Sequence, residues 1–209
     1  MATIRLGNLF QMNISAIPDD SKVILIGEQA VGKTTISNQL SNQQLAPHYN
    51  PTVGASFISK DMDTKCGNIT LHIWDTAGQE RYRSLIPLYA RNSVAAIVVF
   101  DSTRKETYDC IYDTWVNQAL QNADKKIQIY IVANKIDQEP AFDLKVPEAE
   151  AQEHGYKFFR VSAFQHDTVE ALFKEVAEDI AEIVNEAKQE NFSQEADRAT
   201  ISHEGSKCC

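Results

Sequence analysis

A glycine-rich segment near the start of the chain carries the residues best suited to hold a phosphate chain. Residues 27–34, read as GEQAVGKT, match the pattern G-x-x-x-x-G-K-[ST] and follow an apolar run at 23–26. Backbone N–H groups in such a loop surround phosphate oxygens, and the N-terminus of the next helix adds partial positive charge. Lys33 reaches the terminal phosphates, and the Thr34 hydroxyl is a ligand for Mg²⁺. The residues expected to contact the phosphates are Gly27, Gln29, Ala30, Val31, Gly32, Lys33, Thr34 and Thr35.

A second group of polar residues follows the alternating apolar segment at 69–74. Asp75 stands where the expected strand ends, and a carboxylate in that place holds Mg²⁺ through water. Gly78 can present its backbone N–H to a γ-phosphate because no side chain blocks the approach, and Gln79 can orient an attacking water. A phosphate loop alone leaves open a kinase, an ATPase and a GTPase, so the choice depends on residues elsewhere in the chain.

The segment Asn134-Lys135-Ile136-Asp137 follows another apolar run and indicates which nucleotide base the site would bind. A carboxylate there can accept hydrogen bonds from guanine N1–H and from the exocyclic amine of guanine. Adenine offers neither donor in that place, so a site that bound adenine would leave a buried acceptor unpaired. Four residues alone are weak evidence, but in order after the phosphate loop and Asp75 they favour a guanine nucleotide.

Composition excludes several other classes of protein. The 209 residues carry a net charge of −9, which argues against a nucleic-acid groove because binding there neutralises phosphates. The four cysteines and five histidines show no zinc-site or disulfide spacing, which fits a reduced, cytosolic setting. No stretch approaches the length of a transmembrane helix, and the N-terminus lacks the apolar region of a signal peptide.

Short apolar strands and helical segments alternate from residue 22 onward, which is typical of an α/β domain with a mostly parallel sheet. A turn signal at 67–68 separates two neighbouring strands, which are expected to form an antiparallel hairpin at one edge. The predicted fold class is an α/β P-loop NTPase domain, with six strands and helices on both faces of the sheet. The expected strands are 22–26, 57–61, 69–74, 95–100, 127–133 and 157–161, and the expected helices are 33–41, 107–121, 147–154 and 169–184.

One domain, residues 21–187, is expected between a flexible N-terminal extension at 1–20 and a tail at 188–209. The apolar periodicity is lost in the tail, so the tail is predicted to be disordered. Its positive charges are matched by negative ones, so it has no polybasic patch. Membrane binding would therefore depend on lipid attached to Cys208 and Cys209, since two lipid groups give stable anchoring.

These motifs together resemble the Ras superfamily of small GTPases. The resemblance rests on GEQAVGKT, PTVG, WDTAGQERYRSL, NKID and Ser162-Ala163, in matching order and spacing over about residues 21–187. An aromatic triad matches the one through which the Rab family meets its effectors, and the Cys-Cys end resembles the doubly geranylgeranylated end of Rabs. Short motifs, among them Ser59-Lys60-x-Met62, look most like the Golgi-associated Rab subgroup. The triad residues are Phe57, Trp74 and Tyr89.

The resemblance implies a small G domain that switches between GTP and GDP and hydrolyses GTP. Thr52 matches the switch I threonine that contacts Mg²⁺ and the γ-phosphate, and switch II would begin at Asp75. The implied Mg²⁺ ligands are Thr34, Thr52 and Asp75, and the implied catalytic residues are Gln79, Lys33 and Thr52. The implied base and γ-phosphate contacts are Gly78, Asn134, Lys135, Asp137, Ser162, Ala163 and Phe164.

The resemblance also implies partners and a place in the cell. The partners are a GTPase-activating protein, a guanine nucleotide exchange factor, a GDP dissociation inhibitor, the prenylation machinery and effectors. The protein would be a monomer on the cytoplasmic face of endomembranes, with the Golgi favoured and a cytosolic pool when GDP is bound. No arginine finger is assigned within the chain, so unaided turnover is expected to be slow.

Three positions depart from the family pattern. Phe164 replaces the usual lysine after Ser-Ala, and Leu45 stands where many relatives carry an aromatic that packs on guanine. Gln29 lies next to the expected γ-phosphate, where it would crowd Gln79 and slow hydrolysis. A GTP-binding scaffold with little or no turnover is therefore an open alternative. A small-molecule P-loop kinase is a weaker one, because NKID and the terminal cysteines have no place in it.

Overall fold

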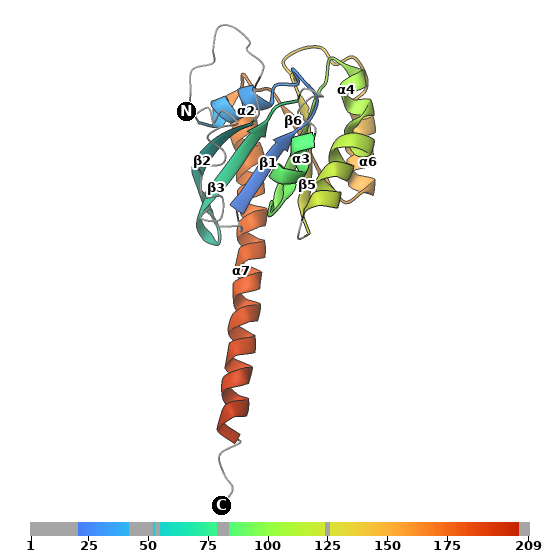
Figure 1. The fold of residues 1–209 in the computed structure, drawn as a ribbon. Coiled ribbons are helices and arrows are strands. Elements are labelled where there is room, and N and C mark those ends of the chain that lie inside the picture. The colour runs from blue at the N-terminus through green and yellow to red at the C-terminus, as the bar shows by residue number, and fades with distance from the viewer. Residues whose placement is uncertain (1–20, 42–51, 53–54, 79–83, 124–125, 205–209) are drawn as a thin grey trace, which may run out of the picture.

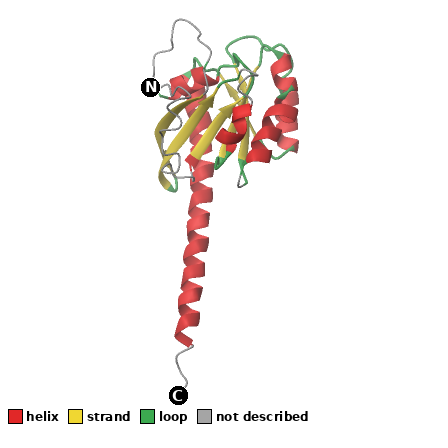
Figure 2. Ribbon diagram, viewed as in Figure 1, coloured by secondary structure: helices red, strands yellow, loops and turns green. Residues whose placement is uncertain are grey.

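A six-stranded sheet forms the centre of the molecule (Figures 1 and 2). The computed structural model describes residues 21–41, 52, 55–78, 84–123 and 126–204, with side chains described as far as residue 186. The strand order is β2-β3-β1-β4-β5-β6; β2 and β3 are antiparallel, and every other neighbouring pair is parallel. The strands are β1 (Lys22–Ile26), β2 (Ala55–Thr64), β3 (Gly67–Thr76), β4 (Ala95–Asp101), β5 (Gln128–Asn134) and β6 (Lys157–Val161).

The sequence pattern of each strand agrees with its place in the sheet. Every residue of β1 and β4 is buried, because helices cover both faces of these interior strands. The edge strand β2 is buried at its start and then alternates with exposed positions. The predicted hairpin is confirmed, with Asp63 opposite Asn68 and Thr64 opposite Gly67 across the turn.

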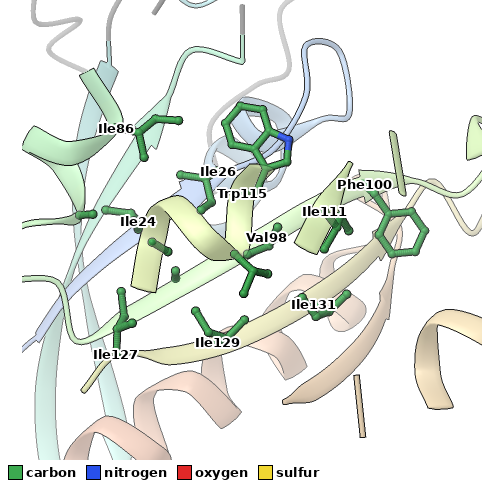
Figure 3. Packing of buried hydrophobic residues seen from close by; sticks show 14 of the residues in the cluster. Ile24, Ile26, Ile86, Val98, Phe100, Ile111, Trp115, Ile127, Ile129 and Ile131 are labelled. Atoms are coloured by element: carbon green, nitrogen blue, oxygen red, sulfur yellow. The ribbon is translucent and has the colours of Figure 1, made fainter. Parts of the chain in front are cut away.

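Helices cover the two faces of the sheet as two separate layers. Along β1, Val23 and Leu25 face the layer formed by α2 and α7, whereas Ile24 and Ile26 face the layer formed by the remaining helices. Figure 3 shows the second layer, in which the fully buried indole of Trp115 packs among aliphatic side chains of the sheet. The helices are α2 (Lys33–Leu40), α3 (Ile86–Ala90), α4 (Lys105–Asp109), η4 (Ile111–Val116), α5 (Asn117–Asn122), α6 (Lys145–Glu153) and α7 (His166–Glu204).

Two helical segments differ from the prediction. The single helix expected at 107–121 is instead α4, a π-helical turn (η4) and α5 in succession. The tail was expected to be disordered from residue 188, but α7 continues to Glu204 and projects beyond the sheet (Figure 1). Residues 166–204 contain no glycine or proline, and extending an existing helix fixes one residue per hydrogen bond, so loss of an apolar stripe does not end the helix.

The parallel arrangement collects several loops at one edge of the sheet. Strands β1, β3, β4, β5 and β6 are parallel, so the segments that follow them all leave from the same edge. Ligands of open α/β sheets bind at this carboxyl edge. The segments that the sequence marks for phosphate, Mg²⁺ and base all begin there. Within the described part of the chain, no helix is both long and apolar enough to span a bilayer.

Candidate nucleotide-binding site

The loop between β1 and α2 has the backbone that the glycine pattern predicts. Gly27 has a φ of 139°, and a Cβ there would lie 2.1 Å from the carbonyl oxygen of Val99. Gly32 has a φ of 100°, and a Cβ there would lie 2.2 Å from Nδ2 of Asn134. Ala30 also adopts a left-handed conformation, with a φ of 63°. The loop therefore needs glycine at both ends, and it carries strain at the alanine between them.

Lys33 lies inside this loop rather than in solvent. Its ammonium group donates hydrogen bonds to the carbonyl oxygens of Gly27 and Glu28, both at 2.8 Å. Burial lowers the pKa of Lys33 to about 8, and the charges of Asp75 and Glu28 oppose that shift. A Cβ on Gly78 would lie 2.5 Å from the Lys33 Nζ, so the backbone at 78 approaches the ammonium closely. The structure thus brings Lys33 and Gly78, both expected at the terminal phosphates, to one place.

Three oxygen-bearing side chains converge beside Lys33. The Thr34 hydroxyl donates to Asp75 Oδ2 at 2.6 Å and lies 2.7 Å from the Thr52 hydroxyl. The other carboxylate oxygen of Asp75 is buried and has no hydrogen-bond partner among the described residues. Burial raises the pKa of Asp75 to about 6, although hydrogen bonds from Thr34 and Ser56 and the charge of Lys33 act against it.

These residues fit a magnesium ion. Hydroxyl and carboxylate oxygens are the ligands that Mg²⁺ prefers, and the unpartnered oxygen of Asp75 needs a cation or water to satisfy it. A divalent cation would also hold Asp75 in its ionised form. Thr34, Thr52 and Asp75 come from three separate segments, and the tertiary structure brings all three together.

Asn134 joins two loops of the site. Its Nδ2 donates to the Val31 carbonyl at 2.7 Å, and its Oδ1 accepts from the Ala163 N–H at 3.1 Å. It therefore links the phosphate loop to the loop after β6. The exposed Asp137 carboxylate accepts a 2.6 Å hydrogen bond from the Ser162 hydroxyl, which orients it at the rim of the site.

Lys135 has a partner that sequence reasoning missed. Its ammonium group donates to Asp101 Oδ2 at 2.6 Å, and the residue has a left-handed φ of 67°. Asp101 is buried at the end of β4, where its other oxygen accepts from the N–H and hydroxyl of Thr103. Burial alone would raise the pKa of Asp101, but hydrogen bonds from Lys135, Thr103 and Arg104 lower it. The sequence feature that could have identified Asp101 is its position as a carboxylate at the end of the continuous apolar run that forms β4.

Other predicted contacts have less definite roles. Thr35 lies half-buried in the first turn of α2, and the Gln29 carbonyl accepts a hydrogen bond from Arg104 at 3.1 Å. Phe164 is 63% exposed, and its N–H donates to the Ser162 hydroxyl at 3.3 Å. The side chain of Phe164 therefore lies outside the packed core.

The three aromatic residues expected to meet effectors do form one cluster. The ring centroids of Phe57 and Trp74 are 5.3 Å apart, and those of Trp74 and Tyr89 are 5.9 Å apart. Trp74 and Tyr89 are only 2% and 3% exposed, so Phe57 is the most accessible of the three. The imidazole of His72 stacks on Phe57, and the Lys22 ammonium lies 5.5 Å from the centroid of the Trp74 ring.

Several predicted residues lie outside the described part of the chain. They include the catalytic candidate Gln79, the departure at Leu45, and the lipidation candidates Cys208 and Cys209. The predicted roles of these residues, and the prediction for residues 1–20, stay predictions.

The sequence of this chain is similar to proteins of one family, and that family is the one that the motifs of the site resemble. The Ras family model matches residues 22–182. A Rab-related GTPase of Acanthamoeba polyphaga mimivirus is 38% identical over 167 residues, which cover 78% of this chain and 77% of the relative. A Rab-5B-type protein of Dictyostelium discoideum is 38% identical over 164 residues, covering 77% and 75%. Rab-11A of the same organism is 31% identical over 166 residues, covering 78% and 77%.

Family membership carries general properties. Ras-family proteins bind GTP and GDP, generally with Mg²⁺, and the Rab-named relatives are GTPase switches that act through regulators and effectors. The matched region contains the phosphate loop, the cluster of Thr34, Thr52 and Asp75, and the segment 134–137 described above. This chain therefore belongs to the Ras family of small GTPases, within its Rab branch.

Proposed function

We propose that this protein is a Rab-type switch that binds GTP and GDP with Mg²⁺, hydrolyses GTP, and recruits effectors in intracellular vesicle traffic. The observation that carries the proposal is the convergence of Thr34, Thr52 and Asp75 beside Lys33. A site that bound only a nucleoside monophosphate would not need these groups. In the proposed function they meet where the β- and γ-phosphates of a bound triphosphate would lie.

The proposed chemistry is positioning together with charge compensation. Lys33 would neutralise phosphate oxygens, and backbone N–H groups of the loop would surround them. Mg²⁺, when bound, supplies a divalent charge that compensates the charge developing on the phosphate oxygens. Gln79 would place the attacking water, and Thr52 would hold the metal side of the site. No arginine has been assigned as a finger within the chain, so an activating protein would complete the site.

The proposed base selection depends on Asp137. The Ser162 hydroxyl donates to one oxygen of this carboxylate, which restricts its rotation. An oriented carboxylate accepts from guanine N1–H and the exocyclic amine, and adenine lacks both donors. Asn134, with both ends of its amide engaged, would hold the loops around the base rather than read the base itself.

The switch would operate through two segments that meet the γ-phosphate. Thr52 is tied to Thr34, and the backbone at Gly78 lies against Lys33, so both respond to what occupies the space between them. A triphosphate would tether both segments, and hydrolysis would release them. Effectors would then bind the cluster of Phe57, Trp74 and Tyr89 in one state only. Since Trp74 and Tyr89 are buried in this structure, the contact would need that surface to open.

The proposed membrane attachment depends on the terminal cysteines. Geranylgeranyl groups on Cys208 and Cys209 would anchor the protein to the cytoplasmic face of endomembranes, with a GDP dissociation inhibitor holding a cytosolic pool. The Golgi is proposed from the short sequence motifs alone. Changing Cys208 and Cys209 to serine should make the protein fully soluble in cells, whereas a persistent membrane fraction would contradict the anchor.

A scaffold that binds GTP without turning it over is the second candidate. Gln29 favours it, because this half-buried residue belongs to the loop, and a side chain directed at the γ-phosphate would crowd Gln79. Both candidates share every phosphate contact, so only turnover separates them. The Gln79 prediction favours the hydrolysing switch.

Single-turnover GTP hydrolysis tests the proposal. Purified protein loaded with GTP and Mg²⁺ should release phosphate slowly and in a single exponential phase. The Gln79→Leu variant should bind GTP equally well and release phosphate at least tenfold more slowly. Competition should show preference for GTP over ATP. Binding of GTP without any phosphate release, with and without an activating protein, would favour the scaffold, and binding of ATP in preference to GTP would reject both.

A further inference from the structure

We propose that Arg104 is a positioning residue for the phosphate loop, and that it sets how long a bound guanine nucleotide stays in place. The inference rests on the proposed nucleotide binding and adds a residue to it. Arg104 belongs to none of the motifs that predicted the site, and it lies 75 positions after Gln29, whose carbonyl it contacts.

Arg104 holds the loop through a charged hydrogen bond. Its Nη2 donates to the carbonyl oxygen of Gln29 at 3.1 Å, and its Nε donates to Asp101 Oδ2 at 2.9 Å. The two contacts use different nitrogens of one planar guanidinium, so the carboxylate fixes the orientation in which the loop is bound. The Asp101 side chain is 1% exposed, whereas that of Arg104 is 38% exposed. The carboxylate that holds the guanidinium is therefore buried, and the guanidinium itself lies at the surface.

The contact fixes the direction of a peptide group that phosphate binding uses. In a trans peptide the C=O and the N–H of the next residue point in opposite directions. Because the Gln29 carbonyl points toward Arg104, the N–H of Ala30 points away from Arg104. Ala30 has a φ of 63°, a left-handed conformation that is unfavourable for a residue other than glycine. Arg104 thus supplies a contact from outside the loop at the peptide that precedes this left-handed alanine.

The Asp101 carboxylate also binds the segment proposed to read the base. Asp101 Oδ2 accepts from Arg104 and from Lys135, at 2.9 and 2.6 Å. This one buried carboxylate thus binds Arg104, which contacts the phosphate loop, and Lys135, which belongs to the segment proposed to read guanine. A change at either end of the nucleotide site is transmitted to the other through Asp101. Asp101→Asn should therefore release both contacts, and its effect should not add to that of Arg104→Gln.

Release of a fluorescent GDP analogue into excess GDP, at saturating Mg²⁺, tests the inference. Arg104→Gln removes the charge, and Arg104→Lys keeps the charge but cannot span Asp101 and Gln29 together. Lys105→Gln is the matched control, because Lys105 is the next residue, is exposed, and pairs with Asp109 away from the loop. We expect Arg104→Gln to release the analogue about tenfold faster, Arg104→Lys to be intermediate, and Lys105→Gln to match the wild type.

A second readout separates positioning from general destabilisation. The ³¹P NMR resonance of the β-phosphate of bound GDP reports the loop itself, and it should shift in Arg104→Gln and Arg104→Lys but not in Lys105→Gln. Wild-type release rates together with an unshifted β-phosphate resonance in both Arg104 variants would overturn the inference. A wild-type protein that binds no guanine nucleotide would instead overturn the proposed function, so the two failures are distinguishable.

Discussion

The Thr34 hydroxyl donates a 2.6 Å hydrogen bond to the Asp75 carboxylate, which joins the start of α2 to the end of β3. The second carboxylate oxygen is buried and unpartnered among the described residues, and the Thr52 hydroxyl lies 2.7 Å from that of Thr34. The fold thus gathers these oxygen atoms, from three separate segments, in one place. Preorganisation of this kind reduces the free energy needed to assemble a metal site.

Replacing Thr34 should uncouple nucleotide affinity from Mg²⁺. In the wild type, chelation of Mg²⁺ should accelerate release of bound GDP at least tenfold, because the ion bridges protein and phosphate. In Thr34→Ala, release should be fast with or without Mg²⁺, and the difference should shrink to about twofold. Ser41→Ala, which changes a hydroxyl at the far end of the same helix, is the control and should behave like the wild type. A Thr34→Ala protein with full Mg²⁺ dependence would contradict the metal assignment.

Replacing Asp137 by asparagine should change the base preference. The amide keeps the shape of the side chain but offers an N–H where guanine also donates. Guanine nucleotide affinity should fall by about a hundredfold or more, and xanthine nucleotides, which carry an acceptor at that position, should bind better than guanine nucleotides. Equilibrium competition between GDP and XDP measures the exchange of preference. Unchanged preference for GDP would mean that Asp137 does not read the base.

Alanine at Gly27 should destabilise the domain more than alanine at Gly155. Both positions have positive φ, but only at Gly27 would the new Cβ overlap a carbonyl oxygen of β4, at 2.1 Å. We expect a loss of roughly 3 kcal/mol in the free energy of unfolding for Gly27→Ala and about 1 kcal/mol for Gly155→Ala. Urea unfolding without nucleotide gives both values free of any change in ligand binding. Equal losses would show that the backbone moves to make room at Gly27.

His72 should titrate below its ordinary pKa of 6.5. Burial lowers the pKa of this imidazole, whereas the charge of Asp61 raises it; Phe57 stacks on the ring, and Lys22 of β1 is its partner in the sheet register. As pH falls below 6.5 the unfolded chain binds the proton first, so the free energy of unfolding decreases. NMR titration should show the His72 pKa moving up toward 6.5 in Phe57→Ala and further down in Asp61→Asn. If the pKa of His72 were unchanged in both variants, neither Phe57 nor Asp61 would set the pKa of this imidazole.

The local sequence contained enough to predict most of the fold. Continuous apolar runs predicted β1, β4 and β5, the alternation around Gly67 predicted the hairpin, and the glycine spacing predicted a strand, a loop and a helix around Lys33. These features depend on interactions between residues close in the chain, so a pattern of residue types reports them. The π-helical turn was missed because a helical pattern of residue types does not separate α-helical from π-helical hydrogen bonding. The continuation of α7 was missed because an existing helix can extend without an apolar stripe.

Contacts between loops were decided only by the tertiary structure. The register of β4 and β5 sets Asp101 beside Asn134, and this pairing brings Lys135 within reach of a carboxylate 34 residues earlier. The pairing of β1 with β4 brings Arg104, which follows β4, to the phosphate loop that follows β1, 75 residues away in the chain. Sequence alone determined which residue types were available for phosphate, metal and base. The pairing of parallel strands determined which of them meet, because it brings loops that are distant in the chain to one edge of the sheet.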